Sequence, residues 1–104
     1  MTLGDGRIRH TVVFTPRHAA GSPEEADFLA AAAGLAAIPG VEAFEILRET
    51  SPKNAYRFGI SMEFAGGAAY QAYNAHPDHV RFVQERWLVE VTDFLEIDYE
   101  PRAC

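Results

Sequence analysis

The amino-acid sequence predicts a single α+β domain in which helices cover one face of a four-stranded antiparallel sheet. Four segments have the composition or alternation of half-buried strands. Two regions between them carry helix-start signals followed by apolar residues at helical spacing. The chain has 104 residues, of which 48% are hydrophobic. That is enough for one core without disulfides or structural metal ions.

The first strand is predicted over residues 8–15, with His10, Val12 and Phe14 on its apolar face. His10 is therefore expected to point toward the core. Ser22 and Pro23 open the first helix as N-cap and first-turn residues, and Pro39-Gly40 follows its end near residue 38. The predicted buried stripe of this helix consists of Phe28, Ala32, Leu35 and Ala36.

The remaining elements follow from alternation and from the placement of Gly and Pro. Strands are predicted over residues 41–49, 55–64 and 94–100, and helices over 68–75 and 77–90. The resulting order of strand, helix, strand, strand, helix, strand is that of a ferredoxin-like fold, with both crossovers right-handed and the helices on one face.

The uncovered face of this sheet is also predicted to be apolar. Val13 lies there in the first strand, and Leu95, Ile97 and Tyr99 share one side of the last strand. A sheet that is apolar on both sides needs a second cover. We therefore expect a two-fold homodimer whose sheets face each other to form an α/β barrel.

Charge and composition exclude several classes of partner. The net charge is −6 and the nine Lys and Arg residues are scattered, so no nucleic-acid partner is expected. No apolar run approaches the roughly 20 residues of a membrane span, and no signal peptide is recognisable, so we expect a cytoplasmic protein without membrane association. The one cysteine, Cys104, cannot form an internal disulfide. Residues 1–6 are expected to be a disordered tail before the domain at 7–104.

The segment YQAYNAHPDHVRF, from Tyr70 to Phe82, carries the densest group of chemically active side chains. Pro77 disfavours helical geometry at the preceding residue, so one helix is expected to end and another to begin there. His79 then lies in the first turn of the new helix, where the helix dipole disfavours an imidazolium. A neutral imidazole is the form that a general base requires. Tyr73, one turn before the break, can face the same volume.

Four motifs together resemble the stress-responsive dimeric α/β-barrel (Dabb) family. They are IRHTVVF, IPGV, the Y-x-x-HPxHVxF block that starts at Tyr73, and IDYEPR. The HPxH block with the first-strand histidine is the most specific part. The resemblance covers nearly the whole chain and implies a homodimer of ferredoxin-like subunits with a cavity between helices and sheet.

Within that family, the tyrosine and HPxH block is similar to that of plant olivetolic acid cyclase, which closes a linear polyketide by an aldol reaction. The resemblance implies catalytic roles for Tyr73 and His79, a pocket position for His10, and no cofactor. Small residues on the first helix and Glu96 near the end of the sheet depart from that enzyme, which implies a different substrate.

An aldol-type reaction needs a base, a hydrogen-bond donor for the developing oxyanion, and a dry cavity. His79 suits the base and Tyr73 the donor. Glu96 is expected to orient His10 if the first and last strands pair. The predicted substrate-binding residues are His10, Phe58, Phe82 and Glu96.

Each of these residues also has a structural interpretation: His79 as a helix-start histidine bonded to backbone, Tyr73 and His10 as core residues. His76 and His79 lack further ligands at metal-binding spacing, so no metal site is predicted. Three functions stay open. The chain is a cofactor-free cyclase or lyase for a small apolar carbonyl compound, a non-catalytic dimer that binds a small ligand or protects other proteins under stress, or a cofactor-independent monooxygenase.

Overall fold

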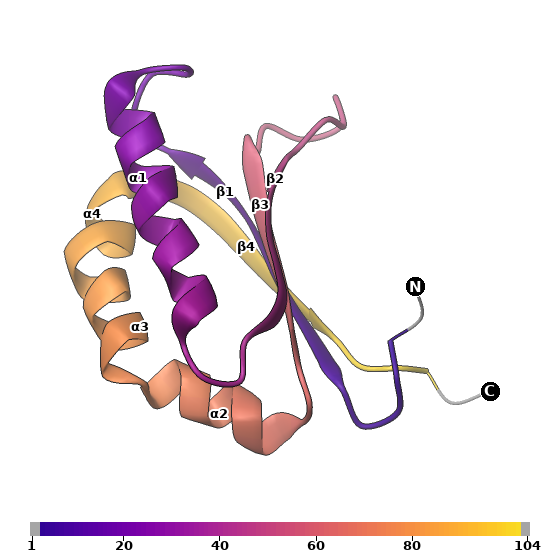
Figure 1. Ribbon diagram of the computed structural model, residues 1–104. Helices are drawn as coiled ribbons and strands as arrows, with labels where there is room; N and C mark the ends of the chain where they lie inside the picture. The colour runs from indigo at the N-terminus through magenta and orange to yellow at the C-terminus, as the bar shows by residue number, and fades with distance from the viewer. Residues whose placement is uncertain (1–2, 103–104) are drawn as a thin grey trace.

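The computed structural model describes residues 3–102 and confirms the predicted α+β architecture (Figure 1). Four antiparallel strands form one sheet in the order β2-β3-β1-β4, and the helices lie together on one of its faces. The strands are β1 (Ile8–Pro16), β2 (Glu42–Arg48), β3 (Phe58–Phe64) and β4 (Val91–Tyr99). The helices are α1 (Pro23–Ala33), α2 (Gly67–Ala75), α3 (Pro77–Phe82) and α4 (Leu88–Glu90), with a 3₁₀ segment η1 (Gly34–Ala37) and a π-helical segment η2 (Val83–Trp87). Met1, Thr2, Ala103 and Cys104 lie outside the described residues.

The register of β1 determines which side chains face the helices. His10, Val12 and Phe14 are all buried on that face, as their alternation predicts. In β4 the residues opposite them are Asp98, Glu96 and Phe94, respectively.

The first helix ends differently from the prediction. The Ser22 hydroxyl accepts a hydrogen bond from the Glu25 backbone N–H at 3.1 Å, so the predicted N-cap is confirmed. After Ala33 the chain tightens into η1, which has three residues per turn. The buried side chains consequently follow a spacing of three, at Ala32, Leu35 and Ile38. Ala36 is exposed, and its prediction as a core residue is wrong for this reason.

The break at Pro77 has the predicted form. His76 adopts an extended backbone conformation between α2 and α3, and its Nδ1 accepts a hydrogen bond from the Asp78 N–H at 3.1 Å. His76 is thus the N-cap of α3. The helical region then continues through η2 and α4 to Glu90, and β4 begins at Val91, three residues earlier than predicted. The third strand begins three residues later than predicted, since the Asn54 side chain accepts a hydrogen bond from the Tyr56 N–H and turns the chain there.

Aromatic rings fill most of the layer between helices and sheet. Phe14 contacts Phe28 and Trp87 with ring centroids 5.9 and 4.9 Å apart, and Phe82 packs against Phe28 at 5.8 Å. None of the helices in the described part of the chain has the length and hydropathy that a membrane span requires.

The opposite face of the sheet is open and carries a group of apolar side chains beside polar ones such as Arg9 and Glu63. Leu95, Ile97 and Tyr99 of β4 are 49%, 38% and 52% exposed, and Leu47 of β2 is 46% exposed. Leu47, Gly59, Val13 and Leu95 lie in one row across the four strands. Among residues 3–102 no segment covers this row, which contains Val13 and Leu95 as the sequence predicts.

Candidate active site

A cavity of about 260 Å³ lies between β1, β4 and the helical region α2–η2. Its walls are mainly apolar, formed by core residues such as Val12, Met62 and Trp87. Four titratable side chains also line it, namely His10, Tyr73, His79 and Glu96, together with the amide of Asn74. The structure therefore brings the two predicted catalytic residues and three of the four predicted substrate-binding residues to one small volume.

Tyr73 and His79 are in direct contact across the break at Pro77. Their ring centroids are 4.4 Å apart, with 45° between the ring planes. Nδ1 of His79 lies 3.1 Å from the backbone oxygen of Asn74. A carbonyl oxygen only accepts, so Nδ1 carries the proton and Nε2 of the neutral ring holds a free lone pair. Nδ1 can therefore bond to the backbone while Nε2 acts as a base, so the structural and functional interpretations of His79 are compatible.

Burial sets the protonation of this pair. Removal from solvent lowers the pKa of His79 below its ordinary value, and the nearby His10 acts in the same direction, while the Asn74 hydrogen bond and Glu96 act against it. Burial also raises the pKa of Tyr73, to which the negative charge of Glu96 adds. At neutral pH the pair thus consists of an imidazole that can take a proton and a phenol that keeps its own.

The Tyr73 hydroxyl has no hydrogen-bond partner among residues 3–102, although the residue is only 2% exposed. No fully buried side-chain nitrogen or oxygen in the same residues lacks a partner. The Tyr73 oxygen must therefore be reached from the cavity that its ring lines. A buried donor in this situation is available to a ligand with an acceptor oxygen.

His10 is held by a second pair of side chains that the sequence did not single out for this role. Its Nδ1 lies 2.6 Å from Oδ1 of Asp98, and the Tyr70 hydroxyl donates to Oδ2 of Asp98 at 2.7 Å. The Tyr70 oxygen is also 2.9 Å from Nδ1 of His10. Because a carboxylate accepts only, Asp98 holds His10 in the tautomer with the proton on Nδ1.

The carboxylate that orients His10 is thus Asp98 and not Glu96, which was the sequence-based expectation. Both residues lie on the helix-facing side of β4, but the register places Asp98 directly opposite His10 and Glu96 opposite Val12. Burial raises the pKa of Tyr70, and its bond to Asp98 adds to this effect. Tyr70 therefore acts as a permanent hydrogen-bond donor to Asp98.

The remaining predicted residues fall into two positions. Phe82 lines the cavity next to His79. Phe58 is not among the described residues that line it and packs against Phe14, with ring centroids 5.9 Å apart. Within the described residues, one cluster has the side chains to hold a metal ion: His10, Glu96 and Asp98, whose ligand atoms lie within 4.8 Å of one another.

The fold and the cavity define a ferredoxin-like α+β domain in which a buried tyrosine of α2 and a half-buried histidine of α3 line a cavity over the sheet. The model of the stress responsive A/B barrel domain (Dabb) family matches residues 8–101, and the chain belongs to this family, as its motifs predict.

Solved structures agree with this assignment. A Dabb family protein with a ferredoxin-like fold from Mesorhizobium loti is 60% identical, with a TM-score of 0.94 over 95% of this chain and 100% of that chain. A dimeric ferredoxin-like protein of unknown function from Thermobifida fusca is 20% identical, with a TM-score of 0.74 over 97% of this chain and 96% of that chain. A hydroxynitrile lyase from Passiflora edulis is 15% identical, with a TM-score of 0.80 over 97% of this chain and 98% of that chain. The last two are alike in fold alone. A search of curated proteins finds no match to the chain.

Proposed function

We propose that this protein is a homodimeric enzyme that removes a proton next to a carbonyl group of a small, largely apolar compound, as cyclases and lyases of the aldol type do. The contact between Tyr73 and His79 in the cavity carries this proposal. Both side chains have the protonation state that the reaction needs, and the cavity around them is mostly hydrocarbon.

In the proposed reaction, Nε2 of His79 takes the proton from the carbon beside the carbonyl, and its electron pair forms the enolate. The Tyr73 hydroxyl donates a hydrogen bond to the enolate oxygen as the charge develops there. The enolate carbon then attacks a second carbonyl of the same molecule, and the resulting alkoxide takes the proton back from His79. General acid–base assistance of this kind contributes about 10²- to 10⁴-fold in rate.

The size and walls of the cavity restrict the substrate. A volume of about 260 Å³ lies slightly below the usual range for sites that take drug-sized ligands. A compact carbonyl compound fits it better than a long polyketide. The charge of Glu96 in the lining disfavours a substrate that carries a carboxylate beside it.

We further propose that a second copy of the chain covers the open face of the sheet. The row from Leu47 to Leu95 places exposed apolar side chains across this face, and burying such a surface stabilises a two-fold pair of identical subunits. The Thermobifida fusca protein with this fold is itself dimeric.

Deuterium exchange tests the proton-transfer step without knowledge of the natural substrate. Small ketones and β-diketones are incubated with the protein in D₂O, and loss of the α-proton signal is followed by NMR. We expect wild-type protein to accelerate the exchange, and His79→Gln to abolish the acceleration. Tyr73→Phe is expected to reduce it about 10- to 1,000-fold.

His76→Ala is the matched control, because it removes an imidazole of the same HPxH block that caps α3 and does not line the cavity. Exchange at the wild-type rate in His79→Gln, with the fold intact, would disprove the proposed base. If no compound exchanges but several raise the melting temperature, the alternative of a non-catalytic ligand-binding dimer is correct. Oxygen uptake with phenolic compounds would instead identify the monooxygenase alternative.

A further inference from the structure

We propose that His10, Glu96 and Asp98 form a binding site for a divalent transition-metal ion where β4 borders the cavity. β1 and β4 are adjacent antiparallel strands, and Asp98 lies directly opposite His10. Glu96, two residues away on β4, points to the same face of the sheet. The three ligand atoms lie within 4.8 Å of one another.

The donor set fits ions such as Zn²⁺, Mn²⁺, Fe²⁺ and Co²⁺. These ions accept imidazole nitrogen and carboxylate oxygen, at about 2.0–2.2 Å for Zn²⁺. Two ligand atoms bound at that distance are separated by at most about 4.2 Å. Glu96 and Asp98 are exposed, so a rotamer change on β4 can bring their oxygens inward by the remaining distance.

Charge and burial favour a cation at this point. The two carboxylates balance a divalent ion, and binding removes the repulsion between them. His10 is only 7% exposed on a central strand, so one ligand is already confined by packing. Preorganisation of this kind lowers the cost of binding. The ion would take the place of the proton that Nδ1 of His10 shares with Asp98 at 2.6 Å.

A second feature of the cavity also indicates a missing ligand. The Tyr73 hydroxyl, in a side chain that is 2% exposed, has no partner within residues 3–102 and opens to the cavity that His10 and Glu96 also line. A water or a small anion bound to the metal ion can accept its hydrogen bond. The metal site does not depend on the proposed proton transfer, since neither Tyr73 nor His79 is a ligand.

The test uses protein without an affinity tag and with Cys104→Ser, because a thiolate is itself a preferred zinc ligand. Zn²⁺ is titrated by calorimetry at pH 7.5, and Co²⁺ is followed by its visible absorption. We expect one ion per chain. Glu96→Gln and Asp98→Asn should each weaken binding at least about tenfold, while His79→Gln should retain the affinity of the parent protein.

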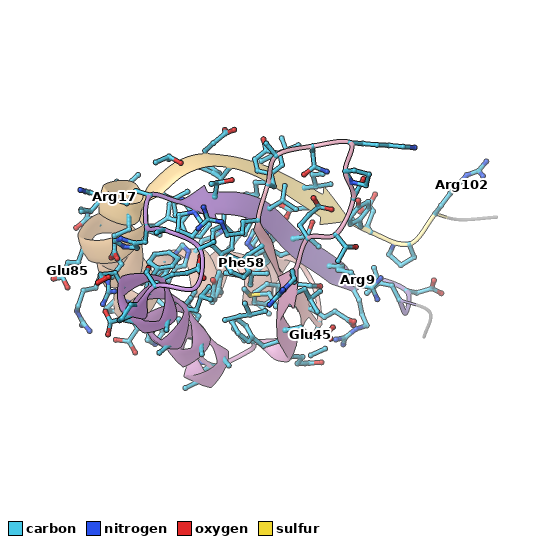
Figure 2. All side chains as sticks on the ribbon, turned by 90° about the horizontal axis from the view of Figure 1, so that it is seen from above. Arg9, Arg17, Glu45, Phe58, Glu85 and Arg102 are labelled. Atoms are coloured by element: carbon cyan, nitrogen blue, oxygen red, sulfur yellow. The ribbon has the colours of Figure 1, made fainter. Side chains whose placement is uncertain are left out.

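Glu85→Gln is the matched control, because it removes one negative charge from an exposed position in η2. Figure 2 shows Glu85 among the helices, at the end of the molecule away from Arg9, which precedes His10 in β1. Its affinity is expected to stay within about twofold of the parent protein, as for a distant surface charge in salt. Absence of saturable binding, or equal weakening in all three carboxylate variants, would overturn the proposal. If neither Glu96→Gln nor Asp98→Asn weakens the affinity, the ion binds elsewhere and the proposal is overturned as well.

Discussion

The cluster of His10, Asp98 and Tyr70 gives a prediction whose size follows from its geometry. Two donors converge on one carboxylate, at 2.6 Å from His10 Nδ1 and at 2.7 Å from the Tyr70 hydroxyl. Hydrogen bonds to a charged group stabilise a protein by about 1.5–3 kcal/mol each. The Asp98 side chain is 37% exposed, and solvent screening reduces each contribution to about 1 kcal/mol.

Tyr70→Phe removes one of these bonds and is expected to destabilise the protein by about 1 kcal/mol. Asp98→Ala removes both and leaves the Nδ1 proton of His10 with the Tyr70 oxygen, 2.9 Å away, as its remaining acceptor, so its cost should reach about 2 kcal/mol. In the double variant the Tyr70 hydroxyl has already lost its charged acceptor, and its removal should cost about 0.5 kcal/mol, the low end for a neutral hydrogen bond. The double-mutant cycle should therefore give a coupling energy of about 0.5 kcal/mol.

Chemical denaturation measures these values directly, and thermal unfolding should show a decrease of about 4–8 °C for each 1 kcal/mol in a domain of this size. Tyr56→Phe serves as the control, because the Tyr56 hydroxyl has no hydrogen-bond partner among residues 3–102, and its loss should change stability by less than about 0.5 kcal/mol. Additive effects of Tyr70→Phe and Asp98→Ala would refute the reasoning. They would show that the two groups do not share a hydrogen bond that matters in solution.

Three further predictions concern the protonation states and the open face. Burial lowers the pKa of His79 in the folded protein, whereas the pKa of a histidine in the unfolded chain is about 6.5. Just below pH 6.5 the unfolded chain therefore binds more protons than the folded protein, and acid lowers the free energy of unfolding. Wild-type protein should thus lose more of its melting temperature between pH 7.5 and 5.0 than His79→Gln does. Burial acts to raise the pKa of Glu25, but hydrogen bonds from the Gly21 N–H and from the Arg57 side chain at 2.6 Å outweigh it and lower the pKa. Glu25→Gln should therefore cost about 2 kcal/mol at pH 7 in denaturant unfolding, and a change below about 0.5 kcal/mol, the range of ordinary surface substitutions, would contradict this. Leu95→Glu should convert a dimer into a monomer in sedimentation experiments. Leu88→Glu introduces the same charge on α4, away from the open face, and should leave the dimer intact. A monomeric wild-type protein would rule out the proposed assembly.

Local chemistry makes most of the fold predictable. The alternation at His10, Val12 and Phe14 identifies the buried face of β1, because period two is specific to strands. Pro77 breaks the helix wherever the rest of the chain lies, so the contact between Tyr73 and His79 across the break could be anticipated.

The orientation of His10 could not be predicted, because it depends on pairing between residues 88 positions apart. Glu96 and Asp98 lie on the same face of β4, and a shift of two residues in the register would place Glu96 opposite His10 in place of Asp98. Nor does the sequence distinguish an α-helical end of α1 from the 3₁₀ segment η1, a choice on which the exposure of Ala36 depends.

β4 links the two proposed properties of the protein. On one side it presents Glu96 and Asp98 to the helices, and on the other it presents Leu95 and Ile97 to solvent. Within residues 3–102, β4 is an edge strand that pairs with β1 alone, and an edge strand without a cover opens more readily than the centre of a sheet. A second copy bound to Leu95 and Ile97 would fix the backbone that carries both carboxylates. Dimerisation should therefore hold the residues that line the cavity on the opposite face in fewer conformations. A monomeric variant should bind ligands at His10 and Glu96 more weakly, although neither of these two residues has been changed.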